Sequence, residues 1–249
     1  CDGKDNDCNG LVDDGFVDGQ GSYTTVKACG ACGNDCTFSS YPNAAVACDT
    51  KAAPAKCVMQ CNEGAFDVDD NPKTGCECIY DGATDLPDGQ DHNCDGVDGE
   101  VANAVFVAKV GKDTAAGTIE APVASVQKGI ALAAAQGKRD VYVATGVYDE
   151  ALGLVAGVSV YGGYSANFRF HDASAYETVL VAPIPTVAKP GAVNGIGIVG
   201  KATVFDGVSV YAANVKAKGA STYGLYLRDC DASVAVRHSS FVAGDASGG

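Results

Sequence analysis

The sequence predicts a mainly β protein built from two modules, and two observations lead to this prediction. Cysteines are concentrated at the start of the chain, since eleven of the twelve lie in residues 1–94. Charge divides near the same place: residues 1–100 hold 20 acidic residues and five lysines, whereas residues 101–249 hold 11 acidic and 12 basic residues. We therefore expect a cysteine-rich, acidic, metal-binding module over residues 1–100. Residues 101–249, which are rich in short Val/Tyr segments, should form a second, β-rich module.

The overall composition excludes several classes of protein. A net charge of −14 argues against binding to the phosphates of nucleic acids or to anionic lipid. No run of about 18 apolar residues is present, so no membrane-spanning helix is expected. The chain opens on Cys1 without an initiator methionine or a signal peptide. We expect it to be a fragment or a processed piece of a longer protein.

Eleven cysteines within 94 residues are typical of secreted domains held together by disulfides. The alternative is a zinc site around Cys29-Gly-Ala-Cys32 and Cys36, but the other spacings are irregular and the only nearby histidine is His92. Disulfides imply an oxidising compartment, which is extracellular or on a bacterial outer surface. Because the number is odd, one thiol is left for an upstream segment, for Cys230 or for another chain. The predicted disulfide cysteines are Cys1, Cys8, Cys29, Cys32, Cys36, Cys48, Cys57, Cys61, Cys76, Cys78 and Cys94.

Residues 5–13 follow the first part of an EF-hand-type calcium loop. Oxygen-bearing side chains occupy loop positions 1, 3, 5 and 9, and Gly10 at position 6 permits the sharp turn. The bidentate glutamate expected at position 12 is absent, because Phe16 stands there. An EF-hand pair of helices is therefore not implied. The candidate ligands of this first loop are Asp2, Asp5, Asp7, Asn9, Leu11 through its carbonyl, Asp13 and Asp14.

The pattern returns 86 residues later without a gap, so that residues 87–96 align with residues 1–10. If Cys1 pairs with Cys8, then Cys94 needs another partner, and Cys76 and Cys78 are nearest. All-oxygen ligands favour calcium over zinc or copper; the alternative is a solvated acidic linker made of turn residues. The candidate ligands of the second loop are Asp88, Asp91, Asn93, Asp95, Val97, Asp98 and Glu100. A weaker third loop contains Asp67, Asp69 and Asn71, with Pro72 in place of the glycine.

The stretch from Cys1 to Asp14 resembles the metal-binding motif repeats of secreted, myxobacterial-type surface copper-binding proteins. Residues 29–36 and 75–77 resemble segments that recur between such motifs. The resemblance covers about residues 1–100 and implies a bacterial cell-surface protein that binds copper. Because the ligands in this chain are hard oxygens, calcium stays the first expectation and copper the second.

The second module begins with a predicted strand over 105–110, a helix over 122–135 and a strand over 141–143. Pro122 is expected in the first turn of the helix and Gly137 after its end. Three later segments, 157–161, 195–199 and 207–211, have similar sequences, which is typical of a β-solenoid or a β-sandwich. The remaining predicted strands are 158–161, 178–181, 196–199, 203–205, 208–211, 225–227 and 234–236.

The block from Ala116 to Glu150 resembles the opening of right-handed parallel β-helix proteins of the pectin-lyase-like superfamily. In those proteins, a helix plugs the open end of the coil, where exposed strand edges invite aggregation. The resemblance covers about residues 101–245 and implies a helix-capped right-handed parallel β-helix of about four rungs. It carries little information about chemistry.

No catalytic constellation stands out, and we expect the protein not to be an enzyme. The polar residues that a polysaccharide lyase or hydrolase would use also fit turns or solvated surface. Cys230 is expected to be a buried, small apolar side chain. The catalytic candidates are Asp206, Arg228, Asp229, Asp231, Arg237 and His238. The tyrosines expected to stack between rungs rather than to bind sugar rings are Tyr142, Tyr148, Tyr161, Tyr164, Tyr176, Tyr211, Tyr223 and Tyr226.

The predicted function is that of an extracellular structural or adhesive surface protein, or of a fibre subunit, with structural calcium loops. Its expected partners are further copies of itself, other surface proteins or glycans. Two alternatives remain: a polysaccharide-binding or polysaccharide-cleaving β-helix protein, and a surface copper-binding protein.

Overall fold

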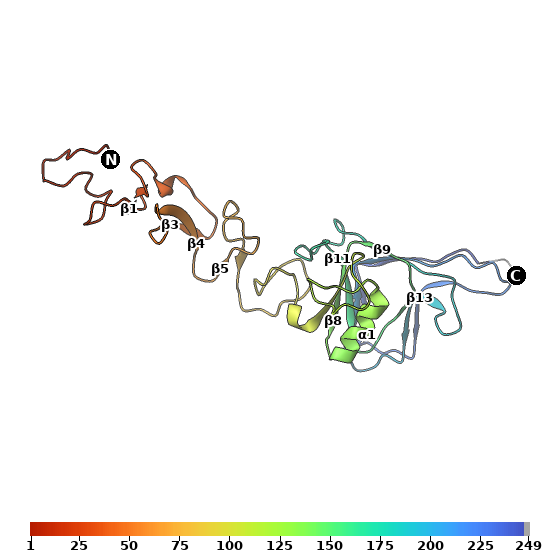
Figure 1. The fold of residues 1–249 in the computed structure, drawn as a ribbon. Helices are drawn as coiled ribbons and strands as arrows, with labels where there is room; N and C mark the ends of the chain where they lie inside the picture. Colours follow the sequence, from red (N-terminus) through yellow and green to blue (C-terminus); the bar gives the residue numbers. More distant parts are fainter. Residues whose placement is uncertain (247–249) are drawn as a thin grey trace. The chain divides into compact units, whose positions relative to one another are not determined.

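The computed structural model describes residues 1–246, which form a mainly β structure with one α-helix and five disulfides. The chain forms two compact units (Figure 1), each described by itself below. Unit 1 contains Cys1–Thr84 and His92–Gly96, and unit 2 contains Asp85–Asp91 and the residues from Val97 onward. The two units therefore interleave in sequence between residues 84 and 97, upstream of the boundary expected at residue 100.

Unit 1 is held together by disulfides rather than by a hydrophobic core. Its buried apolar residues are two alanines, Ala28 and Ala65, and four half-cystines. Cross-links replace core packing in small domains of this kind. Its elements are three antiparallel strand pairs, β1 (Thr24–Thr25) with β2 (Ala28–Cys29), β3 (Ala44–Asp49) with β4 (Lys56–Cys61) and β5 (Ala65–Phe66) with β6 (Cys78–Ile79), and the 3-10 helix η1 (Cys36–Phe38).

Ten of the eleven predicted cysteines form disulfides, and Cys8 does not. Cys94 pairs with Cys78, one of its two expected neighbours. The inclusion of Cys8 among the disulfide cysteines is wrong in this structure, because Cys1 is bonded to Cys32 and Cys8 is an exposed free thiol. The bonds are Cys1–Cys32, Cys29–Cys48, Cys36–Cys57, Cys61–Cys76 and Cys78–Cys94.

Unit 2 is a parallel β-solenoid of about four turns. Successive strands visit three sheets in a fixed order, and each strand pairs in parallel with the corresponding strand of the next turn. The turns are β8 (Asp140–Ala144), β9 (Gly146–Tyr148) and β10 (Leu152–Gly153); β11 (Ser159–Tyr164), β12 (Thr178–Val181) and β13 (Gly191–Ile196); β14 (Thr203–Asp206), β15 (Val208–Tyr211) and β16 (Tyr223–Arg228); and β17 (Val234–Arg237) with β18 (Ser240–Val242).

The solenoid is preceded by the 3-10 helix η2 (Val101–Asn103), strand β7 (Ala104–Val107) and helix α1 (Val126–Gln136). Strand β7 pairs in parallel with β8, so α1 lies in the connection between two neighbouring parallel strands. Gly129 permits close packing there, because a Cβ atom on it would lie 2.6 Å from a methyl group of Val107. Residues 1–246 contain no helix that is long and apolar enough to cross a membrane.

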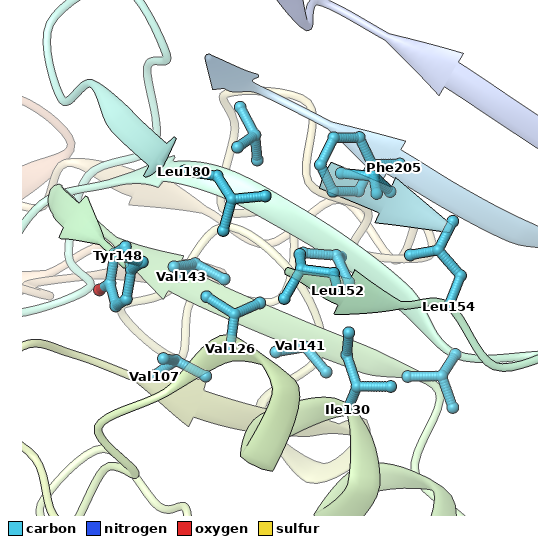
Figure 2. Packing of buried hydrophobic residues seen from close by; sticks show 14 of the residues in the cluster. Val107, Val126, Ile130, Val141, Val143, Tyr148, Leu152, Leu154, Leu180 and Phe205 are labelled. Carbon is cyan, nitrogen blue, oxygen red and sulfur yellow. The ribbon is translucent and has the colours of Figure 1, made fainter. Parts of the chain in front are cut away.

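Side chains from α1 and from all three sheets share one core (Figure 2). In the figure, Val126 and Ile130 of α1 lie beside Val107, Val141 and Leu152. The buried side chain of Asn194 is fully hydrogen-bonded. It accepts a hydrogen bond from the Gly191 N–H and donates to the carbonyls of Leu152 and Gly191. These bonds satisfy the amide, so its burial is tolerated.

Helix α1 begins four residues and ends one residue later than predicted. Pro122 lies outside the first turn, because the chain before Val126 is held by other contacts: Asp113 accepts hydrogen bonds from the N–H groups of Ala124 and Ser125. Gly137 closes the helix in the left-handed conformation, with φ 68°, as its position predicted.

The N-terminus of α1 is capped by a side chain from a different element. The Glu150 carboxylate, which follows β9, accepts hydrogen bonds from the N–H groups of Val126 and Gln127 at 2.7 and 2.9 Å. A negative charge at this end also opposes the positive end of the helix dipole.

Replacing Glu150 with alanine is expected to lower the free energy of unfolding of unit 2 by about 1–2 kcal/mol, because two helix N–H groups lose their acceptor. Urea denaturation of the full chain measures this loss. Asp149, an exposed neighbour, is the matched control, and its replacement with alanine should change stability by less than about 0.5 kcal/mol. Equal losses at both positions would contradict the capping role.

Candidate metal centre

The three acidic loops share one backbone feature. The residue at loop position 4 has a left-handed conformation in each: Cys8 at φ 60°, Asp70 at φ 56° and Cys94 at φ 58°. The glycines at position 6 of the first two loops, Gly10 and Gly96, also agree, at φ 90° and 89°. The gapless sequence repeat is therefore a structural repeat, and the third loop follows the same path at position 4 despite its proline.

The first loop brings together four of its candidate ligands. The Asn9 N–H lies 3.2 Å from oxygens of both Asp5 and Asp7, and the Asn9 amide donates to Asp7 and Asp14. The Gly10 N–H donates to Asp5 and lowers the pKa of that carboxyl group. Of the other three candidates, Asp2 and Leu11 have local roles, since Asp2 accepts from the Lys4 N–H and the Leu11 N–H donates to Asn9.

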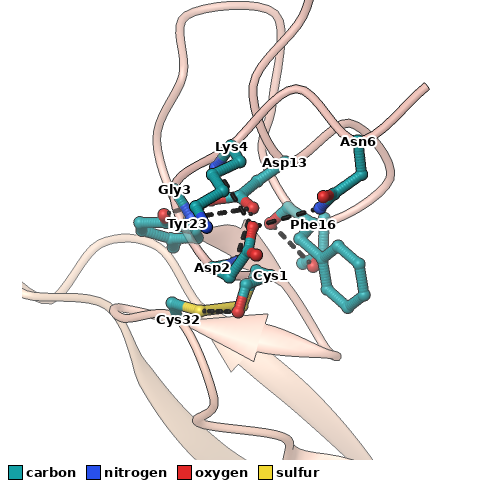
Figure 3. The surroundings of a disulfide bond; sticks show 10 residues. Cys1, Asp2, Gly3, Lys4, Asn6, Asp13, Phe16, Tyr23 and Cys32 are labelled. Atoms are coloured by element: carbon teal, nitrogen blue, oxygen red, sulfur yellow. Dashed lines mark hydrogen bonds between the residues drawn. A yellow bond between two sulfur atoms is a disulfide. The ribbon is translucent and has the colours of Figure 1, made fainter. Parts of the chain in front are cut away.

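Asp13 and Asp98 each connect the end of their loop to its beginning by accepting hydrogen bonds from backbone N–H groups. The Asp13 carboxylate accepts the N–H groups of Asp2 and Gly3 and the Tyr23 hydroxyl, which lowers the Asp13 pKa (Figure 3). Asp98 accepts the corresponding N–H groups of Asp88 and Gly89. Asp98 is thus the counterpart of Asp13, although the second loop is one residue shorter than a gapless alignment requires. Whether either carboxylate also binds a cation stays a prediction.

The candidates of the second loop are divided between the two compact units. In unit 1, the side chain of Asn93 accepts the Asp95 N–H at 2.9 Å. In unit 2, Asp88 accepts the Gln90 N–H, and Val97 is buried in a cluster with aromatic rings. The two remaining candidates of unit 2, Asp91 and Glu100, are partly buried.

The third loop, the weakest of the three in sequence, brings three carboxylates close together. Oxygens of Asp67, Asp69 and Glu77 all lie within 4.8 Å of one another. The Asn71 N–H donates to both Asp67 and Asp69, at 3.1 and 2.8 Å, as Asn9 does in the first loop. Desolvation, together with the negative charges of Glu77 and Asp69, raises the pKa of Asp67. A bound cation would relieve this repulsion.

Glu77 is the site residue that the sequence prediction missed. It stands ten residues after Asp67, at loop position 11, where an EF-hand-type pattern does not place a ligand. It lies between Cys76, bonded to Cys61, and Cys78, bonded to Cys94. The segment from Gly75 to Glu77 stood out in the sequence only by resemblance, and no local pattern connected it to Asp67.

The three cysteines of the zinc alternative, Cys29, Cys32 and Cys36, are all oxidised in disulfides. The sulfurs of Cys29, Cys36 and Cys57 lie close together, but all three are oxidised in disulfides. Zinc sites in proteins use the deprotonated thiol, which a disulfide does not offer.

The structure brings two pairs of the catalytic candidates into contact. Asp206 pairs with His238 at 2.9 Å, and the exposed Arg228 lies 3.4 Å from its neighbour Asp229. Asp231 accepts the N–H groups of Gly200 and Ser233 and so belongs to a turn. Arg237 stands opposite Asp206 in the register of β14 and β17.

The tyrosines divide between core and surface. Tyr142, Tyr148 and Tyr164 are fully buried, and the rings of Tyr142 and Tyr164 stack at 4.8 Å. Tyr211 and Tyr223 are exposed. Cys230 is a half-buried free thiol that packs against the solenoid core.

No protein-family model, curated protein or solved structure matches this chain. The two resemblances noted in the sequence therefore stay predictions, and function is inferred from geometry alone.

Proposed function

We propose that this protein is an extracellular structural protein whose disulfide-linked unit 1 is stiffened by calcium bound at its acidic loops. The convergence of Asp67, Asp69 and Glu77 carries the proposal. Five disulfides are consistent with an oxidising compartment outside the cell.

Calcium is the cation that these donors favour. All the gathered groups are oxygens: three carboxylates in the third loop, and carboxylates with the Asn9 amide in the first. Hard oxygen ligands on flexible loops suit calcium, whereas copper prefers nitrogen and sulfur. Extracellular calcium modules bind at about 10⁻⁴–10⁻³ M, so we expect an affinity in that range.

The third loop is tested by replacing Glu77 with glutamine. We expect calorimetry to show calcium affinity about tenfold weaker at that site, because one charged ligand is lost. Glu63→Gln is the matched control, since it removes one exposed negative charge from the same unit. An equal loss of affinity in both variants would mean that calcium is attracted only by the general negative charge of unit 1. Bound copper that survives dialysis against excess calcium would identify copper as the cation instead.

Chelation should also destabilise unit 1. A site at ten times its dissociation constant adds about 1.4 kcal/mol to folded stability, so EDTA should lower the melting temperature of unit 1 by about 6–11 °C. Calorimetry of the full chain with and without EDTA measures this shift. An unchanged transition, with no calcium in the purified protein, would leave the acidic loops as solvated linkers.

The proposed role of the β-solenoid is to make contact with further copies, other surface proteins or glycans. Strands β16, β17 and β18 are each the last strand of their sheets within residues 1–246, and such edges are templates for further pairing. Light scattering across protein and calcium concentrations tests self-association, and a monomer under all conditions would remove it.

A further inference from the structure

A groove in unit 2, which we call the corner groove, has a volume of about 690 Å³. It lies where β14 and β17 end and the chain turns toward the next sheet, and the long connection between β11 and β12 forms one wall. Its lining residues are Pro87, Asp88, Gly89, His171, Asp172, Ala173, Ser174, Asp206, Gly207 and His238.

The floor of the corner groove contains an oriented imidazole. Asp206 is the last residue of β14 and is only 8% exposed, and its carboxylate lies 2.9 Å from Nδ1 of His238. Because a carboxylate only accepts, Nδ1 carries the hydrogen, and Nε2 of the neutral ring is then an acceptor. The His238 side chain is 78% exposed, so a ligand in the groove can reach Nε2.

The wall adds a second fixed acceptor. The hydroxyl and the N–H of Ser174 both donate to Asp172, which holds the pKa of that carboxyl group below its usual value and keeps it ionised. His171 adds no ligand group, because its two ring nitrogens contact Asp98 and Gly162. Among residues 1–246, no lysine or arginine lines the groove.

The negative charge of the corner groove is a local feature and does not reflect the net charge of the solenoid. Residues 101–249 hold 11 acidic and 12 basic residues, so the solenoid is almost neutral. A divalent cation fits poorly, since the groups of three acidic, histidine or cysteine side chains found to converge within 4.8 Å in the described residues include none from the groove. Spread-out acceptors suit a ligand with several donors.

We propose that the corner groove binds an arginine side chain of a partner protein. A guanidinium group carries five N–H donors in a planar fork, is more weakly hydrated than an ammonium group, and pairs with carboxylates in a bidentate manner. Asp206 and Asp172 supply the carboxylates, and His238 supplies a further acceptor beside Asp206.

The test is a titration of the full chain with the labelled peptide acetyl-Gly-Arg-Arg-Gly-amide at fixed salt, followed by fluorescence anisotropy. Asp172→Asn and Asp206→Asn should each weaken binding by about tenfold, as expected for the loss of a hydrogen bond to a charged group. Asp149→Asn, which removes an exposed charge elsewhere on the solenoid, should change binding by less than about twofold.

Three results would overturn the proposal. Equal weakening by all three variants would show general charge attraction, and full binding by Asp172→Asn would remove the groove as the site. Displacement of the peptide by equimolar zinc or calcium would make the groove a metal site instead. Because Asp172 is exposed, its variant tests the proposal even if Asp206→Asn does not fold.

Discussion

Reduction of the five disulfides is expected to unfold unit 1 and to leave the β-solenoid of unit 2 folded. Each bond closes a loop of between 15 and 31 residues, which corresponds to about 3 kcal/mol in the chain-entropy account of cross-links. Unit 1 buries only alanines and half-cystines as apolar residues, so little else holds it together. Hydrogen exchange with mass-spectrometric detection, with and without a phosphine reductant, measures both units in one sample.

The solenoid provides an internal control for this experiment. Its core is made of valine, leucine, isoleucine and aromatic side chains, and its only cysteine, Cys230, is a free thiol. Protection in β8, β11 and β14 should therefore be unchanged by the reductant. Persistent protection of β3 and β4 after complete reduction would show that packing alone folds unit 1.

Replacing His171 with phenylalanine is expected to lower the free energy of unfolding of unit 2 by about 3–5 kcal/mol. His171 Nδ1 lies 2.5 Å from the carboxylate of Asp98, whose side chain is 5% exposed, and Nε2 lies 3.0 Å from the carbonyl of Gly162. Both partners act as acceptors, so both ring nitrogens donate. Removing the imidazole leaves the Asp98 charge buried with backbone N–H groups alone.

Phenylalanine separates the loss of the hydrogen bonds to Asp98 and Gly162 from the loss of ring packing. It keeps an aromatic ring at the position where the His171 ring stacks on Tyr164, with ring centroids 4.4 Å apart. The control is His238→Phe, which removes a histidine–aspartate contact whose imidazole is 78% exposed and screened by water, so it should cost less than His171→Phe. Urea denaturation measures both. If the loss at His171 does not exceed that at His238, the buried pair does not stabilise unit 2.

Strand positions were predictable where a local pattern was long enough to be seen. β12 and β15 have the predicted bounds, since each is a four-residue run rich in residues of high β propensity. The solenoid strands β9, β10 and β18 were missed, because two or three residues carry no readable period. The similar segments 157–161 and 207–211 contribute to different sheets, β11 and β15. A local sequence encodes a strand but not the sheet that it joins.

The candidate site shows the same division between local and long-range information. The first loop was predictable, because spacing alone places Asp5, Asp7 and Asn9 around one turn. Glu77 was not, since a pair of disulfides and the β5–β6 strand pair bring it back to Asp67. The role of Asp98 was also hidden, because its partner His171 lies 73 residues away.

Glu77 lies between two half-cystines, so calcium binding at the third loop, as proposed above, would be coupled to the formation of the disulfides of Cys76 and Cys78. If closing the bonds of Cys76 and Cys78 raises the calcium affinity of the third loop by some factor, calcium raises the stability of those bonds by the same factor. Calcium should therefore make the reduction potentials of these disulfides more negative. The resistance of these two disulfides to reductants would then depend on the calcium concentration of the surroundings.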